Sequence, residues 1–303
     1  MPAFSFPPVS SAAPIGVFDS GIGGLSVLRA LRAELPDERF VYLADSGYAP
    51  YGERDLAHVV ERSRSVTRQL REVHGIKALV VACNTATTGA IQLLREEHPD
   101  LPLVGVEPAI KPAIAVTRTG RVGVIGTRGT LASAKFAALL ASLQSQADFV
   151  VQPCDGLALA IETEVLAPPS NPFPNAGPAS THPLEATDAE AGTAALCRRY
   201  TQAMGRFGTG PGEIDTLVLG CTHYVFVADA LRAALGPDIG FIETGEPVAR
   251  QTRRLLDRHA LLAPAGGLGG AAPVELVSTG DAQLLEAAAA RWLGLAAASP
   301  LAV

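Results

Sequence analysis

Two cysteines stand where a thiol could exchange protons with a substrate. Cys83 and Cys221 each directly follow a short apolar run and open a stretch of helical character. Backbone N–H groups and the positive end of the helix dipole favour a thiolate at such a position, so we expect both thiols to have a lowered pKa and to be reactive. We assign Cys197 and Cys154 to packing, because free cysteine is commonly a small buried hydrophobic residue.

Two opposed thiols suit one class of reaction in particular. One group removes a proton from one face of a carbon and the other returns a proton to the opposite face, which is racemisation or epimerisation. A cysteine hydrolase would need only one thiol with a histidine base. A metal site would need more ligands at short spacing, and neither C-x-x-C nor H-x-x-x-H occurs. A pyridoxal-phosphate racemase would need one of the chain's lysines: Lys77, Lys111 and Lys135.

Polar residues near the ends of other apolar runs complete a candidate site. Asp19-Ser20-Gly21 and Gly23-Gly24 form a short-residue turn that could bind a carboxylate or hold an acid near Cys83. His223 could move a proton at Cys221 near neutral pH. Neutral hydrogen-bonding groups suited to ammonium and carboxylate groups are also present: Asn84, Thr85, Thr127, Thr130 and Thr222. Such residues at helix starts also serve as N-caps, and the glycine turn does not match the dinucleotide pattern G-x-G-x-x-G.

The elements that must position these residues alternate between short apolar runs and stretches of helical period. This alternation predicts an α/β fold with mainly parallel strands, whose ligands lie at the carboxyl ends of the strands. The predicted strands are 15–18, 40–44, 78–82, 102–106, 121–125, 148–152, 215–219, 239–243 and 274–278.

The strand and turn motifs occur twice in the same order. Asp19 and Gly126 lie 107 positions apart in similar motifs, whereas Cys83 and Cys221 lie 138 positions apart. A proline-rich segment at 167–190 accounts for most of the difference. The economical interpretation is a duplicated α/β half, with two similar lobes facing one another and a loop inserted into the second.

Composition narrows the range of partners. The formal net charge is −6, and such a chain lacks the positive field that nucleic-acid backbones require. Apolar runs stay short of the roughly 18 residues that cross a bilayer, so we expect no membrane partner. The segment 1–13 is expected to be a flexible leader without secretory character, which predicts a cytoplasmic protein with reduced thiols.

Several motifs together resemble the cofactor-independent aspartate/glutamate racemase superfamily, and within it the glutamate racemases. The similarity runs from about Ile15 to Asp281. It rests on Asp19-Ser20-Gly21-Ile22-Gly23-Gly24-Leu25, Pro50-Tyr51-Gly52, Cys83-Asn84-Thr85-Ala86, Gly105-Val106-Glu107-Pro108 and Gly220-Cys221-Thr222-His223.

The resemblance implies a role for each site residue. Cys83 and Cys221 would be the catalytic acid/base thiols, each acting on one enantiomer of glutamate without a cofactor or metal. Asp19 would assist Cys83, whereas Glu162 and His223 would assist Cys221. Substrate binding would fall to Asp19, Ser20, Pro50, Tyr51, Gly52, Asn84, Thr85, Thr127, Thr130 and Thr222.

The resemblance also implies an architecture and a setting. Two pseudo-symmetric Rossmann-like lobes would enclose the active site in the cleft between them. The first lobe would comprise 14–107 with 229–303, and the second 108–228. The protein would be a homodimer that supplies D-glutamate for peptidoglycan synthesis. The alternatives are a related racemase acting on aspartate or hydantoin, and a two-lobed protein that binds an amino acid without turnover.

Overall fold

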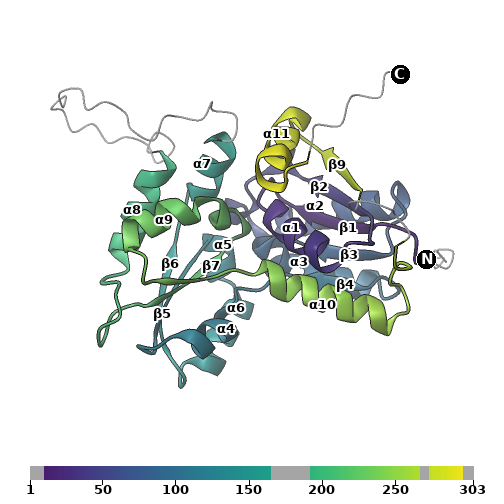
Figure 1. Cartoon of the computed structure of the whole chain (residues 1–303). Coiled ribbons are helices and arrows are strands. Elements are labelled where there is room, and N and C mark those ends of the chain that lie inside the picture. The colour runs from purple at the N-terminus through teal and green to yellow at the C-terminus, as the bar shows by residue number, and fades with distance from the viewer. Residues whose placement is uncertain (1–9, 165–191, 267–272, 296–303) are drawn as a thin grey trace.

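The protein has two lobes, each built on a parallel β-sheet. The structure, a computed structural model, describes residues 10–164, 192–266 and 273–295. Figure 1 shows the two sheets side by side, with helices packed around each. The predicted insertion at 167–190 and most of the predicted leader at 1–13 lie outside the described residues.

All nine predicted strands are present, and their ends differ from the predicted ends by at most one residue. The first sheet contains β1 (Ile15–Asp19), β2 (Phe40–Ala44), β3 (Ala78–Val81), β4 (Leu103–Gly105) and β9 (Val274–Ser278). The second sheet contains β5 (Arg121–Gly126), β6 (Asp148–Pro153), β7 (Thr216–Gly220) and β8 (Gly240–Ile242). All pairings between these strands are parallel, which confirms the predicted fold class.

The two sheets repeat one topology. The first has the order β4-β3-β1-β2-β9 and the second β6-β5-β7-β8. Reversing the second list gives β8-β7-β5-β6, which matches the first four strands of the other sheet. The pseudo-symmetry predicted from the repeated motifs is therefore present, with Cys83 after β3 and Cys221 after its counterpart β7.

Helices bury both faces of each sheet. Their bounds are α1 (Leu25–Glu34), α2 (Leu56–Glu72), α3 (Asn84–Glu97), α4 (Ile110–Val116), α5 (Arg128–Leu131), α6 (Ala134–Leu143), α7 (Leu157–Glu164), α8 (Thr193–Ala203), α9 (Ala228–Leu235), α10 (Gly245–Arg258) and α11 (Ala282–Leu293), with 3₁₀ turns η1 (Ser46–Tyr48), η2 (Tyr51–Glu53) and η3 (Thr222–Val227). In the first lobe α1, α10 and α11 cover one face, whereas α2 and α3 cover the other. In the second lobe α7, α8 and α9 lie opposite α4 and α6.

The composition of the strands explains why the sheets are covered on both sides. Every residue of β1, β2 and β3 is buried, and Leu79, Val80 and Val81 form the continuous apolar run expected of a parallel strand between two helical layers. Successive side chains point to opposite faces, so Val80 packs under α1 and Leu79 under α2 and α3. This rigid core holds the strand ends where the candidate residues lie.

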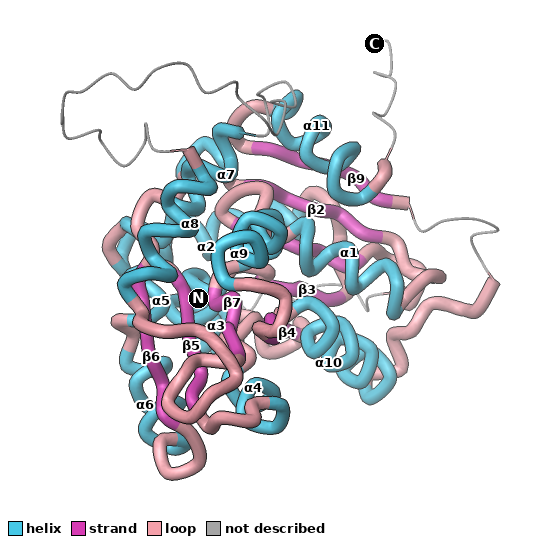
Figure 2. The backbone as a smooth tube through the Cα atoms, turned by 60° about the vertical axis from the view of Figure 1, so that its left-hand side comes forward, coloured by secondary structure: helices cyan, strands magenta, loops and turns pink. Residues whose placement is uncertain are grey.

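The chain crosses between lobes later than the expected boundary at residue 228. β8 pairs with β7 through Thr216–Gly240 and its neighbours, so it belongs to the second sheet although 229–303 was assigned to the first lobe. After β8 the chain returns, and α10 packs along α1 (Figure 2). β9 then joins the edge of β2.

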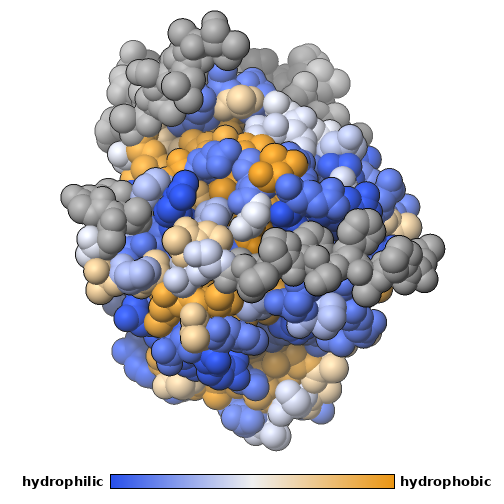
Figure 3. Space-filling view, turned by 90° about the vertical axis from the view of Figure 1, so that its right-hand side faces the viewer, coloured by the Kyte–Doolittle hydropathy of each residue, from blue (hydrophilic) through white to orange (hydrophobic). Residues whose placement is uncertain are grey.

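No helix in the described ranges is both long and apolar enough to cross a membrane. Figure 3 shows one face of the molecule on which hydrophilic residues predominate and hydrophobic ones lie in separate patches among them.

Candidate active site

A cavity of about 270 Å³ lies between the carboxyl ends of the two sheets. This is slightly below the roughly 300 to 1,000 Å³ of pockets for drug-sized ligands, and it suits a molecule the size of an amino acid. Thirteen of the fourteen predicted site residues line it: Asp19, Ser20, Pro50, Tyr51, Gly52, Cys83, Asn84, Thr85, Thr127, Glu162, Cys221, Thr222 and His223.

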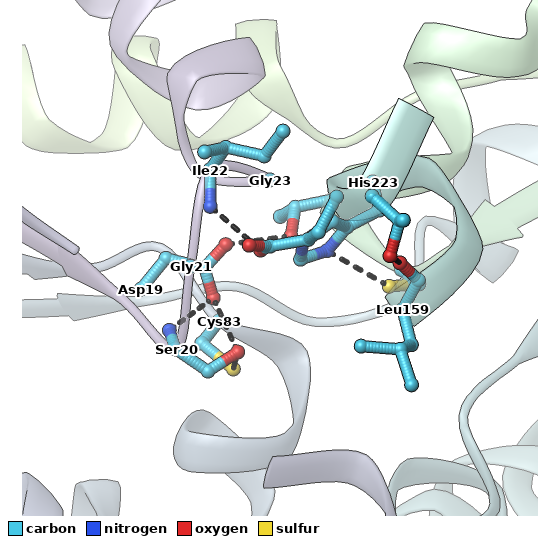
Figure 4. Close-up of polar contacts among 12 residues, drawn as sticks. Asp19, Ser20, Gly21, Ile22, Gly23, Cys83, Leu159 and His223 are labelled. Carbon is cyan, nitrogen blue, oxygen red and sulfur yellow. Dashed lines mark hydrogen bonds and ion pairs between the residues drawn. The ribbon is translucent and has the colours of Figure 1, made fainter. Parts of the chain in front are cut away.

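The two thiols reach this cavity from opposite lobes. Cys83 precedes the first residue of α3 and Cys221 precedes η3, and their exposed fractions are 5% and 6%. Figure 4 shows Asp19, Ser20 and Cys83 on one side of the site and His223 on the other. The arrangement can present a proton donor and a proton acceptor to opposite faces of one small molecule.

Asp19, at the end of β1, joins the lobes beside Cys83. Its Oδ1 accepts a hydrogen bond from the Ser20 N–H at 2.7 Å, and its Oδ2 accepts one from Thr222 Oγ1 at 3.1 Å. Ser20 Oγ in turn lies 3.9 Å from Cys83 Sγ. The side chain of Asp19 is fully buried, and this burial raises the pKa of its carboxyl group even though the charge of nearby His223 lowers it.

His223 connects Cys221 to the other lobe through Glu162. Its Nδ1 lies 3.7 Å from Cys221 Sγ, and its Nε2 lies 2.7 Å from Glu162 Oε1. The same Oε1 accepts a hydrogen bond from the Ile22 N–H of the first lobe at 2.8 Å. Burial lowers the pKa of His223, but the hydrogen bonds and negative charges of Cys221 and Glu162 outweigh it and raise the pKa well above its ordinary value.

The expected lowering of the Cys83 pKa is wrong. Burial raises the pKa of this thiol, and the negative charge of Asp19 raises it further. A hydrogen bond from the Ala86 N–H lowers it, as the helix-start argument predicts, but this effect is the smaller one. Burial and Asp19 therefore favour the protonated thiol of Cys83 and make its thiolate the stronger base.

Two glycines allow the lobes to approach this closely. A Cβ on Gly21 would lie 1.6 Å from Glu162 Oε1, and a Cβ on Gly23 would lie 2.3 Å from His223 Nδ1. Glycine at these two positions leaves room for the carboxylate and the imidazole against the β1–α1 turn. Tyr42 supports this turn from behind, donating from its hydroxyl to the Gly21 carbonyl at 2.7 Å.

Hydroxyl groups form a second bridge between the lobes. Thr85 Oγ1 of the first lobe lies 3.0 Å from Thr127 Oγ1 of the second. Thr130 does not line the cavity as expected, because it is fully buried behind this pair, with its Oγ1 3.3 Å from Thr85 Oγ1 and 3.0 Å from Thr127 Oγ1. Asn84 differs from all three: its side-chain Nδ2 and Oδ1 are buried, and neither has a hydrogen-bond partner within the described residues.

Sequence reasoning missed ten lining residues. They are Ser46, Ala49, Glu53, Arg128, Cys154, Asp155, Ala158, Leu159, Asp281 and Leu284. Most follow strands already predicted, so inspecting every strand end would have found them. Asp281 and Leu284 follow β9, at the start of α11. Cys154 combines its expected role in the core with a place in the cavity wall, and burial raises the pKa of its thiol.

The part of the chain that the structure describes contains no group of three or more His, Cys, Asp or Glu residues arranged to hold a metal ion.

Comparison with known proteins gives one consistent result. Residues 23–252 match the family described as Asp/Glu/Hydantoin racemase. The chain is 44% identical over 284 residues to a glutamate racemase of Ectopseudomonas mendocina, covering 94% of this chain and 96% of that protein. The fold is similar to a glutamate racemase isoform from Bacillus anthracis (TM-score 0.74, 29% identity, covering 94% and 96% of the two chains). It is also similar to the Escherichia coli glutamate racemase in complex with L-glutamate and the activator UDP-MurNAc-Ala (TM-score 0.73, 29% identity, covering 92% and 95%).

Substituting Gly21 tests the contact between the lobes. In Gly21→Ala the new Cβ displaces the Glu162 carboxylate, which loses its hydrogen bonds to Ile22 and His223. We expect the free energy of unfolding to fall by about 1 to 3 kcal/mol in urea denaturation. Gly240→Ala is the matched control, because a Cβ there meets its nearest atom at 3.7 Å. Equal stability of the two variants would contradict this account of the contact.

The raised pKa of His223 predicts a pH dependence of stability. The folded state binds a proton more tightly than the unfolded chain, whose histidine pKa is about 6.5. The stabilisation is therefore complete below about pH 6.5 and is lost as the pH rises through the folded pKa. We expect urea midpoints of the wild type to decline over that window relative to those of His223→Gln. Parallel curves for the two proteins would show that His223 is not protonated in the folded state.

Proposed function

Because the chain belongs to the Asp/Glu/Hydantoin racemase family, we propose that it interconverts L-glutamate and D-glutamate with two thiols and without a cofactor. One observation carries the proposal. Cys83 and Cys221 follow equivalent strands of the two lobes and line one small cavity. A racemase needs such a pair, because the proton leaves one face of Cα and enters at the other.

Neutral side chains around the cavity hold the substrate. The Asn84 side chain is buried, and neither of its polar atoms has a partner in the part of the chain that the structure describes. A bound amino acid can accept from its Nδ2 and donate to its Oδ1. Thr85, Thr127 and Thr222 offer hydroxyl groups around the same cavity, and the segment 50–52 closes one wall. Enclosure of the substrate excludes water and strengthens each of these hydrogen bonds.

Proton transfer follows from the two opposed thiols. One thiolate takes the Cα proton and becomes a thiol, while the other thiol gives its proton to the opposite face and becomes a thiolate. The number of protons on the two sulfurs is unchanged, so the forward and reverse reactions use the same groups in exchanged roles. Each thiol therefore acts as the base for one enantiomer.

The neighbours of each thiol adjust its acidity in different ways. The Cα proton of an amino acid is very weakly acidic, so its removal requires a strong base. Burial and Asp19 raise the pKa of Cys83, which makes the Cys83 thiolate such a base. Asp19, its own pKa raised, takes the thiol proton, and Ser20 Oγ lies 3.9 Å from the sulfur. At Cys221 the protonated His223 supplies a proton to the thiolate, and the resulting neutral imidazole takes the thiol proton back, with Glu162 holding the imidazole in place.

The proposal extends to the setting of the enzyme. Its product D-glutamate enters peptidoglycan synthesis, and the protein acts in the cytoplasm as a homodimer. The pairing of β8 with β7 supports a second lobe that extends from 108 to about 242, with 14–107 and the remainder forming the first. Light scattering on the purified protein tests the homodimer.

Removing either thiol tests the two-thiol mechanism. We expect Cys83→Ser and Cys221→Ser each to abolish racemisation of both enantiomers. Each variant retains exchange of the Cα proton with deuterated solvent for the one enantiomer that its remaining thiol deprotonates, measured by proton NMR.

Cys197→Ala is the matched control, because Cys197 is buried in the core outside the cavity and burial raises its pKa to about 11. It should retain racemase activity. Full activity in Cys83→Ser or Cys221→Ser would rule out the mechanism.

Removing the Asn84 amide separates binding from stability. Because this amide has no hydrogen-bond partner to lose among the described residues, Asn84→Ala should change the free energy of unfolding by less than about 0.5 kcal/mol. Loss of its hydrogen bonds to a charged substrate should raise KM for glutamate about tenfold to a hundredfold. Gln92→Ala, on the exposed side of the same helix, is the control with unchanged KM. An unchanged KM in Asn84→Ala would remove Asn84 from the binding site.

A further inference from the structure

Asp45 is a fully buried carboxylate that the proton-transfer mechanism does not use. It follows β2 directly, and its backbone N–H donates to the Asp19 carbonyl at 2.9 Å. Its side chain accepts hydrogen bonds from three separate segments of the chain. The donors are Arg62 Nε to Oδ2 at 2.9 Å, Arg62 Nη2 to Oδ1 at 2.9 Å, Thr279 Oγ1 to Oδ1 at 2.8 Å, and the Tyr51 hydroxyl to Oδ2.

One of these donors lines the cavity, and another lies next to a segment that does. Tyr51 is the central residue of the segment 50–52. Thr279 immediately precedes the turn into α11, from which Asp281 and Leu284 line the cavity. Both segments are therefore tied to one carboxylate.

Arg62, from α2, fixes that carboxylate. Its guanidinium pairs with both oxygens of Asp45 in the bidentate geometry that gives the most directional ion pairs, and its side chain is only 14% exposed. The same guanidinium lies 3.4 Å above the centre of the Tyr48 ring, in the turn that leads to Pro50. Arg62 thus contacts the 46–53 segment directly at Tyr48 and reaches Tyr51 through Asp45.

The position of this segment determines the width of the cavity. Gly52 faces the second lobe so closely that a Cβ there would lie 2.6 Å from the Cβ of Thr127. Glu53 Oε1 accepts a hydrogen bond from the Gly156 N–H of the same lobe at 3.0 Å. Because the Tyr51 hydroxyl is engaged by Asp45, the segment is anchored from behind while its other side meets the second lobe.

We propose that Asp45 and Arg62 are positioning residues that hold the 46–53 segment and the β9–α11 turn against the substrate, and so set the affinity for it. The proposal rests on the proposed racemase function for its kinetic part. A buried ion pair is weak support for stability, since well-packed apolar residues often serve as well. Its specific contribution here is to tie the 46–53 segment and the β9–α11 turn to one fixed carboxylate.

The kinetic test uses substitutions that remove side-chain hydrogen bonds and preserve shape. Tyr51→Phe and Thr279→Val each remove one hydroxyl donor, and Thr279→Val also removes the oxygen that accepts from the Gly47 N–H. Arg62→Lys keeps the charge but cannot pair with both oxygens. We expect each to raise KM for glutamate by about tenfold while kcat changes less than about twofold. Arg64→Lys, in an exposed ion pair with Glu97 on the same helix, is the control with unchanged KM.

A double variant distinguishes action through Asp45 from independent effects. If Tyr51 and Thr279 both act through this carboxylate, the increase in KM for Tyr51→Phe with Thr279→Val will differ from the product of the single increases. A reduced melting temperature with unchanged KM in all the variants would overturn the proposal, because it would leave Asp45 a purely structural role. The proposal would also be overturned if kcat in these variants fell by the same factor as kcat/KM.

Hydrogen exchange decides the structural part without relying on turnover. In Arg62→Lys and Tyr51→Phe, amides of 46–53 and 279–284 should exchange faster, whereas those of α3 should not change. The proposal would be overturned by an equal increase in exchange rate across the whole chain, or by unchanged exchange rates in the two segments. Absence of glutamate turnover in the wild type would instead reject the proposed function, and the exchange result would still stand.

Discussion

The structure depends on one constraint: two nearly buried thiols must face the same small volume from different lobes. Parallel strands satisfy this constraint, because all their carboxyl ends lie at one edge of a sheet. The two sheets are placed so that these edges face each other. Two hydrogen bonds hold the edges together: Thr222 Oγ1 donates to Asp19, and the Ile22 N–H donates to Glu162. The Thr85–Thr127 and Glu53–Gly156 hydrogen bonds add to these contacts between the lobes.

Equivalent positions in the two lobes carry different chemistry. Cys83 has a carboxyl neighbour in Asp19, whereas Cys221 has an imidazole neighbour in His223. Low exposure makes each of these neighbours effective, since charges interact strongly where water is excluded. The same burial makes an isolated charge costly, which explains why His223 is paired with Glu162 and why the pKa of Asp19 is raised.

The features that could be predicted from the sequence are those that a local pattern of residues determines. The apolar runs located all nine strands, and the repeated motifs placed Cys83 and Cys221 at equivalent strand ends. Spacing alone did not separate Glu162 from Glu164 on the same helix. In the structure Glu162 Oε1 reaches His223, whereas Glu164 Oε1 accepts from the Thr193 N–H. That choice depends on how α7 packs, which periodicity in so short a helix does not reveal.

Other features depend on contacts between distant segments. Nothing in the sequence around 274–284 shows that β9 pairs with β2, which brings Thr279 to Asp45. The helix-start argument was wrong for the Cys83 pKa because it omitted burial and Asp19, both consequences of tertiary packing. The predicted lobe boundary at residue 228 differs from the sheet that β8 joins, because the pairing of β8 with β7 is also a contact that local sequence does not reveal.

The most direct measurement follows the optical rotation of L-glutamate and, separately, D-glutamate incubated in D₂O with the purified protein after removal of small molecules, together with NMR of the Cα position. The two-thiol account predicts that both solutions reach zero rotation and that deuterium replaces the Cα proton. Retention of optical rotation in both solutions, or racemisation without deuterium at Cα, would contradict it.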